Sequence, residues 1–307
     1  MILPYTLRLF VLSLGCFFLI QLVCSCAINL FAARLLKLAE RRRAGSAASL
    51  LLGARLLPAA AALLIVGGIC VPSYFSLEPR TNSEEVGLVV LAMAFFGGLG
   101  CVLAAKRGIS AVVFSRRSAR YFERSSGIMA VAGILRPRIL ISPDVIRGLS
   151  EPELAAAVRH EQAHASSRDN LKRLLVLLAP CGLPLRMLGG FAALETAWAK
   201  YTEWSADDRA VAGDPGRALS LAGALVTVAR MRVPLQTAPL ITPLVADAAD
   251  LEVRIHRLLA GFPAPEKSDR ICNPIWAVAV CTSGFLFAIA APQMFEVAHR
   301  LLEYLIR

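Results

Sequence analysis

Uncharged apolar stretches alternate with charged segments along this chain. Four of the stretches contain no charged residue at all, and they cover residues 9–33, 56–75, 86–105 and 275–295. About 20 consecutive apolar residues are enough for a helix to cross a bilayer, so we predict four transmembrane helices. The intervening residues 106–273 have mixed polarity. We predict that they form a polar domain between two membrane parts, residues 1–105 and 274–307.

Shorter patterns predict the structure inside the polar domain. Two apolar runs, 128–133 and 138–142, are separated by Arg136-Pro137 and predict strands of a small β-sheet. Helical patterns follow, one beginning near Glu151 and another ending at Gly213. We therefore expect a predominantly α-helical, polytopic membrane protein whose polar domain carries a small sheet.

The distribution of charge predicts the orientation in the membrane. Residues 34–55 carry six basic residues against Glu40, a net charge of +5, whereas residues 78–85 carry a net charge of −2. Cytoplasmic loops are enriched in Lys and Arg, so we expect a multi-pass protein of the cytoplasmic membrane with the polar domain inside and both termini outside. A cleaved signal peptide is the alternative for the first stretch, but only Arg8 precedes it, and the basic cluster follows it.

Composition excludes other classes of function. Hydrophobic residues make up 57% of the 307-residue chain, as expected for a protein whose partner is a lipid bilayer. The net charge of +11 comes from basic residues beside apolar segments, and no nucleic-acid motif accompanies them, so direct nucleic-acid binding is not expected. Most of the eight cysteines lie in apolar runs and none forms a C-x-x-C pair, so we expect no redox pair.

One motif carries candidate chemistry, the H-E-x-x-H sequence from His160 to His164. Ser150 followed by Glu153 predicts a capping box, and hence a helix that displays both histidines on one face. Two imidazoles are half of a tetrahedral zinc site, and Glu161 leaves the helix where it can take a proton from a water molecule on the metal. Two ordinary surface histidines are the alternative, but the chain has only four histidines.

Zinc bound by two histidines requires another protein ligand, and Glu203 is our candidate. Asp207 follows one turn later on the same predicted helix face, where it can orient one of the histidines or the ligand. Asp169 and Glu195 are the rival ligands, and a solvated acidic helix is the alternative interpretation of the Glu203 segment.

These motifs resemble those of the membrane gluzincins, a group that includes the BlaR/MecR antirepressor transducers and the HtpX-like proteases. The resemblance rests on Pro137–Ser142, on His160–His164 followed by Arg168-Asp169-Asn170, and on Glu203-x-x-x-Asp207. The order of three spans, a zinc domain and one more span is similar to BlaR/MecR in particular.

The resemblance implies a zinc metalloendopeptidase with one Zn²⁺ per chain. His160, His164 and Glu203 are then the zinc ligands, Glu161 is the general base and acid, and Asp207 supports the ligands. The implied substrate is a cytoplasmic or membrane-proximal protein, such as a helix-turn-helix repressor. A non-proteolytic signalling transducer and an HtpX-like quality-control protease are the alternative functions.

Three further expectations follow from the resemblance. Arg254, in Leu251–His256, either stabilises the oxyanion of the reaction or is an exposed helix arginine. An edge strand aligns the substrate backbone in such enzymes, and we expect residues 128–133 to form it. Thr242-Pro243 stands where the HtpX branch has a histidine-proline pair, which argues against that branch.

The end of the chain differs from the β-lactam-sensing transducers. Only residues 296–307 follow the fourth apolar stretch, so we expect an interfacial amphipathic helix there in place of a penicillin-binding sensor domain.

Overall fold

The computed structural model describes residues 4–78, 86–122, 127–180, 189–231, 239–244 and 248–261, together with Val297 and Arg300. The fourth predicted span, 275–295, lies outside the described residues. So does nearly all of the tail.

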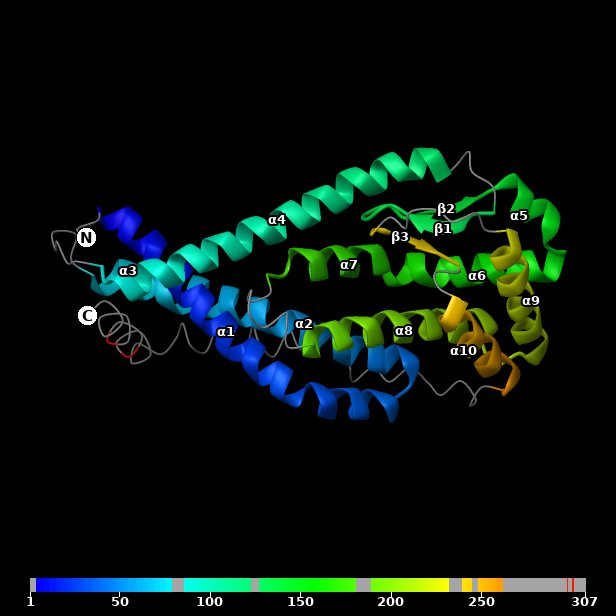
Figure 1. Ribbon diagram of the computed structural model, residues 1–307, viewed down its shortest axis with the longest axis horizontal. Coiled ribbons are helices and arrows are strands. Elements are labelled where there is room, and N and C mark those ends of the chain that lie inside the picture. Colours follow the sequence, from blue (N-terminus) through cyan, green and yellow to red (C-terminus); the bar gives the residue numbers. More distant parts are fainter. Residues whose placement is uncertain are drawn as a thin grey trace.

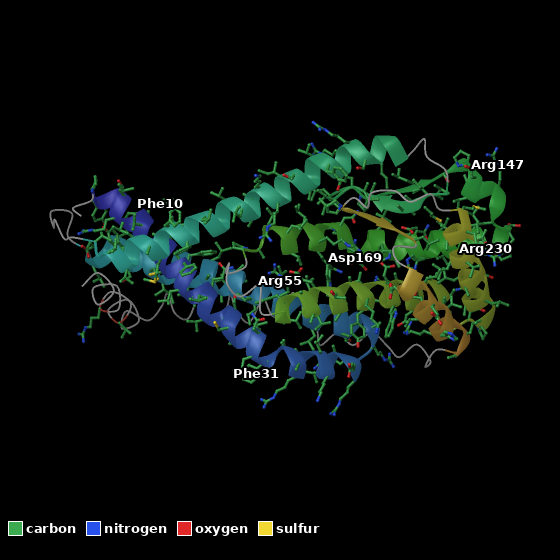
Figure 2. All side chains as sticks on the ribbon, viewed as in Figure 1. Phe10, Phe31, Arg55, Arg147, Asp169 and Arg230 are labelled. Carbon is green, nitrogen blue, oxygen red and sulfur yellow. The ribbon has the colours of Figure 1, made fainter. Side chains whose placement is uncertain are left out.

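Three long helices cover the first three predicted spans. α1 covers Tyr5–Glu40, α2 covers Ala44–Ile65 and continues through a π-helical turn, η1 (Val66–Cys70), into α3 (Val71–Leu77), and α4 covers Leu88–Phe122. Segments of all three are long and apolar enough to cross a membrane. Apolar side chains on their outer faces, among them Phe10 and Phe31, are exposed (Figure 2), as a lipid-facing surface requires.

The membrane helices are longer than the uncharged stretches that predicted them. α4 runs on past Ala105 to Phe122, so the basic residues 116–121 continue this helix. α1 and α4 approach closely at Gly97, where an added Cβ would lie 2.5 Å from the backbone oxygen of Leu14. Small residues allow this kind of close helix contact within a bilayer.

The polar domain contains a three-stranded antiparallel sheet in the order β2-β1-β3 (Figure 1). β1 (Met129–Ala132) and β2 (Arg138–Ile141) confirm the two predicted strands, and they pair with Ala130 opposite Leu140. β3 (Ile241–Pro243) was not predicted, and it pairs with the other side of β1. The prediction that residues 128–133 form a sheet edge is therefore wrong, because β3 occupies the side of β1 that local sequence left open.

Six helices complete the described part of the polar domain. They are α5 (Pro143–Gly148), α6 (Glu151–Ser167), α7 (Asp169–Leu178), α8 (Gly190–Val211), α9 (Pro215–Met231) and α10 (Ala248–Leu259). Alanines of α6 pack against Val211 of α8 and Leu221 and Leu225 of α9 in one buried core. A second core joins α2 to α8 through Leu51, Leu194 and Trp198.

The polar domain lies at the end of the membrane helices where α1 turns into α2 (Figure 1). The basic residues of the 34–55 segment are at this same end, and the chain's N-terminus and α3 are at the other (Figure 1). The basic residues at the end of α1 and the polar domain therefore lie at the same end of the helices.

Candidate metal centre

The H-E-x-x-H motif lies in α6, and this helix begins as the sequence predicted. The backbone N–H of Ser150 donates to the Glu153 carboxylate at 2.8 Å, which completes the capping box. His160 and His164 are one turn apart and both are buried. Their Nε2 atoms are 3.0 Å apart, so both imidazoles face one point and the surface-histidine interpretation is wrong.

The end of α6 brings Asp169 back towards the motif. Arg168 adopts a left-handed conformation, with φ of 53°, and this turn separates α6 from α7. The Nδ1 atom of His164 donates to Asp169 Oδ2 at 2.8 Å, and Lys172 Nζ lies 2.8 Å from the other carboxylate oxygen. Burial opposes ionisation of Asp169, but His164 and Lys172 outweigh it and lower its pKa below the usual value.

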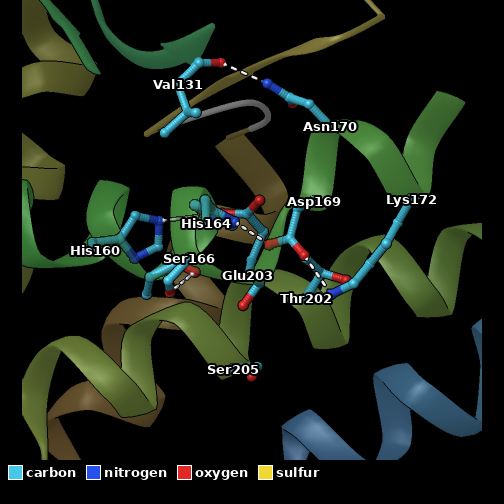
Figure 3. Close-up of polar contacts among 12 residues, drawn as sticks. Val131, His160, His164, Ser166, Asp169, Asn170, Lys172, Thr202, Glu203 and Ser205 are labelled. Carbon is cyan, nitrogen blue, oxygen red and sulfur yellow. Dashed lines mark hydrogen bonds and ion pairs between the residues drawn. The ribbon is translucent and has the colours of Figure 1, made fainter. Parts of the chain in front are cut away.

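Glu203 reaches the two histidines from α8 (Figure 3). Its Oε2 atom lies 3.6 Å from the Nε2 atom of each histidine. A point equidistant from the corners of this triangle lies about 2.0 Å from each of the three atoms, which is a normal bond length from a divalent transition metal to nitrogen or oxygen. His160, His164 and Glu203 are all buried and together could hold a metal ion.

The rival ligands lie elsewhere. Asp169 contacts the far ring nitrogen of His164 and is not part of the ligand triangle. Glu195 forms an ion pair with Arg55 at 2.5 Å, about two turns of α8 before Glu203. The solvated-helix interpretation is also wrong, because Glu203 is 6% and Asp207 is 1% exposed.

Asp207 and Arg254 support the triangle from the side of α8 and α10. Asp207 Oδ1 lies 2.9 Å from His160 Nδ1. Arg254 donates from Nε and Nη2 to the two oxygens of Asp207, at 2.9 and 2.7 Å, and from Nη1 to the carbonyl of Leu244 at 2.8 Å. Its Nη1 atom is also 3.3 Å from Glu203 Oε2.

Arg254 is buried, and its positive charge favours the ionised forms of Asp207 and Glu203. The arginine is 2% exposed, so it is not an exposed helix residue. Burial opposes ionisation of Asp207, but Arg254 and His160 outweigh it and lower its pKa to about 2. Burial likewise opposes ionisation of Glu203, yet His164, His160 and Arg254 hold its pKa well below the usual range. Both carboxylates are therefore anionic at neutral pH.

Glu161 stands apart from these paired groups. It is fully buried, and neither carboxylate oxygen has a hydrogen-bond partner among the described residues. Burial raises its pKa to about 7, although His160 and His164 oppose the shift. A buried carboxylate without a partner is costly, so the site suits a polar group that binds between Glu161 and the ligand triangle.

No family model matches the chain, and neither a curated protein nor a solved structure is significantly similar to it. What can be said of the site therefore depends on the geometry of its own residues.

The Asp169→Ala protein should bind a divalent metal 10 to 100 times more weakly, because partners of a ligating imidazole fix its tautomer and its orientation. Competition with a chromophoric chelator measures this affinity. Glu252→Ala is the matched control, since Glu252 is an exposed carboxylate on α10. An Asp169→Ala protein with unchanged affinity would show that the contact to His164 has no role in metal binding.

Proposed function

We propose that the protein is an integral-membrane zinc endopeptidase that cuts a cytoplasmic or membrane-proximal protein. The observation that carries the proposal is the pairing of a three-atom ligand triangle with the unpartnered carboxylate of Glu161, which is adjacent in sequence to the ligand His160.

The donor set supports zinc as the metal. Two imidazoles and one carboxylate, with a further position open, are typical of catalytic zinc, whereas structural zinc sites are closed by four protein ligands. Contacts to the far ring nitrogens of both histidines, from Asp207 and Asp169, are also usual around zinc. Non-haem iron can use a similar donor set, so the metal has to be identified directly.

The residues around the triangle suit peptide hydrolysis. Zinc held there would polarise a carbonyl group and lower the pKa of a water molecule to about 7. Glu161 takes the proton of the attacking water on a carboxylate oxygen and returns it to the leaving amine nitrogen. Its pKa of about 7 suits both steps, because a proton carrier works best when its pKa is near the working pH.

Arg254 has a positioning role on this proposal. Its guanidinium contacts Asp207, Glu203 and the Leu244 carbonyl. It therefore holds the ligand Glu203 and also Asp207, which contacts the ligand His160. This geometry favours a role for Arg254 in orienting Glu203 over a role in which Arg254 contacts the oxyanion directly.

The substrate side follows from the charge distribution and from the resemblance. The site is at the basic end of the membrane helices (Figure 1), which the positive-inside rule assigns to the cytoplasm. The resemblance to BlaR/MecR transducers extends the proposal to a helix-turn-helix repressor, whose cleavage would relieve repression. That extension is by analogy with the family.

Metal removal tests the proposal. The full chain in lipid nanodiscs should contain one zinc per chain and cleave fluorescein-labelled β-casein. Dialysis against a chelator should stop cleavage, and equimolar zinc should restore it. The three ligands would hold the metal, but they cannot themselves polarise the carbonyl group or activate the water molecule. Cleavage by the metal-free protein, or stoichiometric iron in the purified protein, would contradict the proposal.

A further inference from the structure

We infer that Arg55 of α2 is a positioning residue through which the membrane helices set the geometry of the metal centre. The inference deepens the proposed function and rests on it in one respect, that the His160, His164 and Glu203 group binds a metal ion.

Arg55 is a buried charge inside a membrane helix. It is 4% exposed and lies within the candidate span Ala44–Leu77. A buried charge is costly unless it is paired and hydrogen-bonded. Among the described residues, Arg55 donates to groups of the two polar-domain helices α7 and α8.

The guanidinium joins the end of α7 to the beginning of α8. Its Nε atom donates to Glu195 of α8 at 2.5 Å, and its Nη2 atom donates to the carbonyls of Val176 and Ala179 at 3.2 and 3.4 Å. Val176 is in the last turn of α7 and Ala179 is its C-cap residue, where helix carbonyls lack helical partners and the helix dipole is negative. The ring of Phe191 in α8 also lies 5.4 Å from the guanidinium carbon.

α7 and α8 lead from Arg55 to the two sides of the metal centre. Asp169, at the start of α7, holds His164, and Glu203 of α8 is itself a ligand. At 1.5 Å per residue, Val176 is about 10 Å from Asp169 along α7, and Glu195 is about 12 Å from Glu203 along α8. Figure 2 shows Arg55 and Asp169 towards opposite ends of α7.

Both α7 and α8 therefore run from Arg55 to the metal centre. Because the Arg55 guanidinium donates hydrogen bonds to both helices, it fixes the distance between them and their register. Metal bond lengths tolerate changes of only about 0.2 Å. A small shift of Arg55 together with α2 would therefore be enough to change the distance between the ligand atoms of Glu203 and His164. Apolar packing of Leu51 against Leu194 and Trp198 holds α2 and α8 together, but it is non-directional and does not fix the register of α7 against α8.

The experiment compares Arg55 variants with a packing variant on the full chain in nanodiscs, loaded with cobalt in place of zinc. The visible absorption of bound cobalt reports ligand geometry, and release to a chelator reports how firmly the ligands are held. Arg55→Lys is the milder of two substitutions, because it keeps the charge and loses the planar guanidinium with its several donors. Both Arg55→Met and Arg55→Lys should change the cobalt spectrum and release cobalt about 10-fold faster, an effect similar to that of other residues that orient metal ligands. Glu195→Gln should shift both readouts in the same direction by less.

Leu51→Ala is the matched control, because it loosens the packing of α2 on α8 and leaves the Arg55 side chain and its hydrogen-bond donors in place. It should lower the unfolding temperature and leave the cobalt spectrum unchanged. If Arg55→Lys folds and keeps the wild-type spectrum and release rate, or if Leu51→Ala reproduces its changes, the inference is overturned even in an active peptidase. If the cobalt readouts change as expected but the zinc-loaded wild type does not cleave casein, the endopeptidase proposal falls and the positioning role of Arg55 stands.

Discussion

The Glu161→Gln protein will bind zinc like the wild type and cleave casein 10² to 10⁴ times more slowly, the range typical of a general acid–base residue. Glutamine has nearly the same shape as glutamate but cannot take up a proton. Glu161 is not part of the ligand triangle, so the metal should remain. Zinc content and initial cleavage rates, measured on the same preparation, test both parts of the expectation.

Glu151→Gln is the matched control, because it makes the same change at an exposed position of the same helix. It should cleave casein at the wild-type rate. Glu161→Gln should not lower the unfolding temperature, since the carboxylate that it removes is buried and accepts no hydrogen bond from any described residue. Undiminished proteolysis by zinc-loaded Glu161→Gln would end the endopeptidase proposal.

The second large effect is on stability. Arg254→Met should lower the free energy of unfolding by about 3–5 kcal/mol, the usual cost of removing one partner of a buried ion pair. Asp207 and Glu203 would remain buried without the guanidinium that offsets their charge. Methionine has similar bulk, so the loss would come from charge more than from packing. Denaturant unfolding of the full chain in mild detergent measures it.

Arg217→Met is the control for Arg254→Met. Arg217 is about half exposed and pairs with Asp214 at 3.3 Å on the surface, and such pairs contribute roughly 0–1 kcal/mol. Equal effects of the two substitutions would contradict the view that Arg254 neutralises buried carboxylates. Zinc affinity should fall in Arg254→Met and not in Arg217→Met, because only Arg254 contacts a ligand and a partner of a ligand.

Local patterns predicted those parts of the protein that depend on neighbours in sequence. The first three spans follow from uncharged runs, the start of α6 from Ser150 and Glu153, and the shared face of His160 and His164 from helical spacing. The choice of Glu203 over Asp169 and Glu195 required one more argument, that Asp207 follows it by one turn.

Long-range contacts were harder to predict, because a sequence pattern does not reveal which distant segments meet. β3 is only three residues long and joins β1 from more than a hundred residues away, so nothing local identifies it as a strand. Asp169 was considered as a ligand, but the left-handed turn at Arg168 instead directs it to the far nitrogen of His164.

Local sequence specifies the apolar helices, the motif helix and the residues able to bind a metal, because periodicity and capping act over a few residues. Packing of distant segments brings Glu203 to the histidines, Arg254 to Asp207, and Arg55 to α7 and α8. These contacts link residues 39 to 140 positions apart. They form because the buried charges must find partners once the helices have packed.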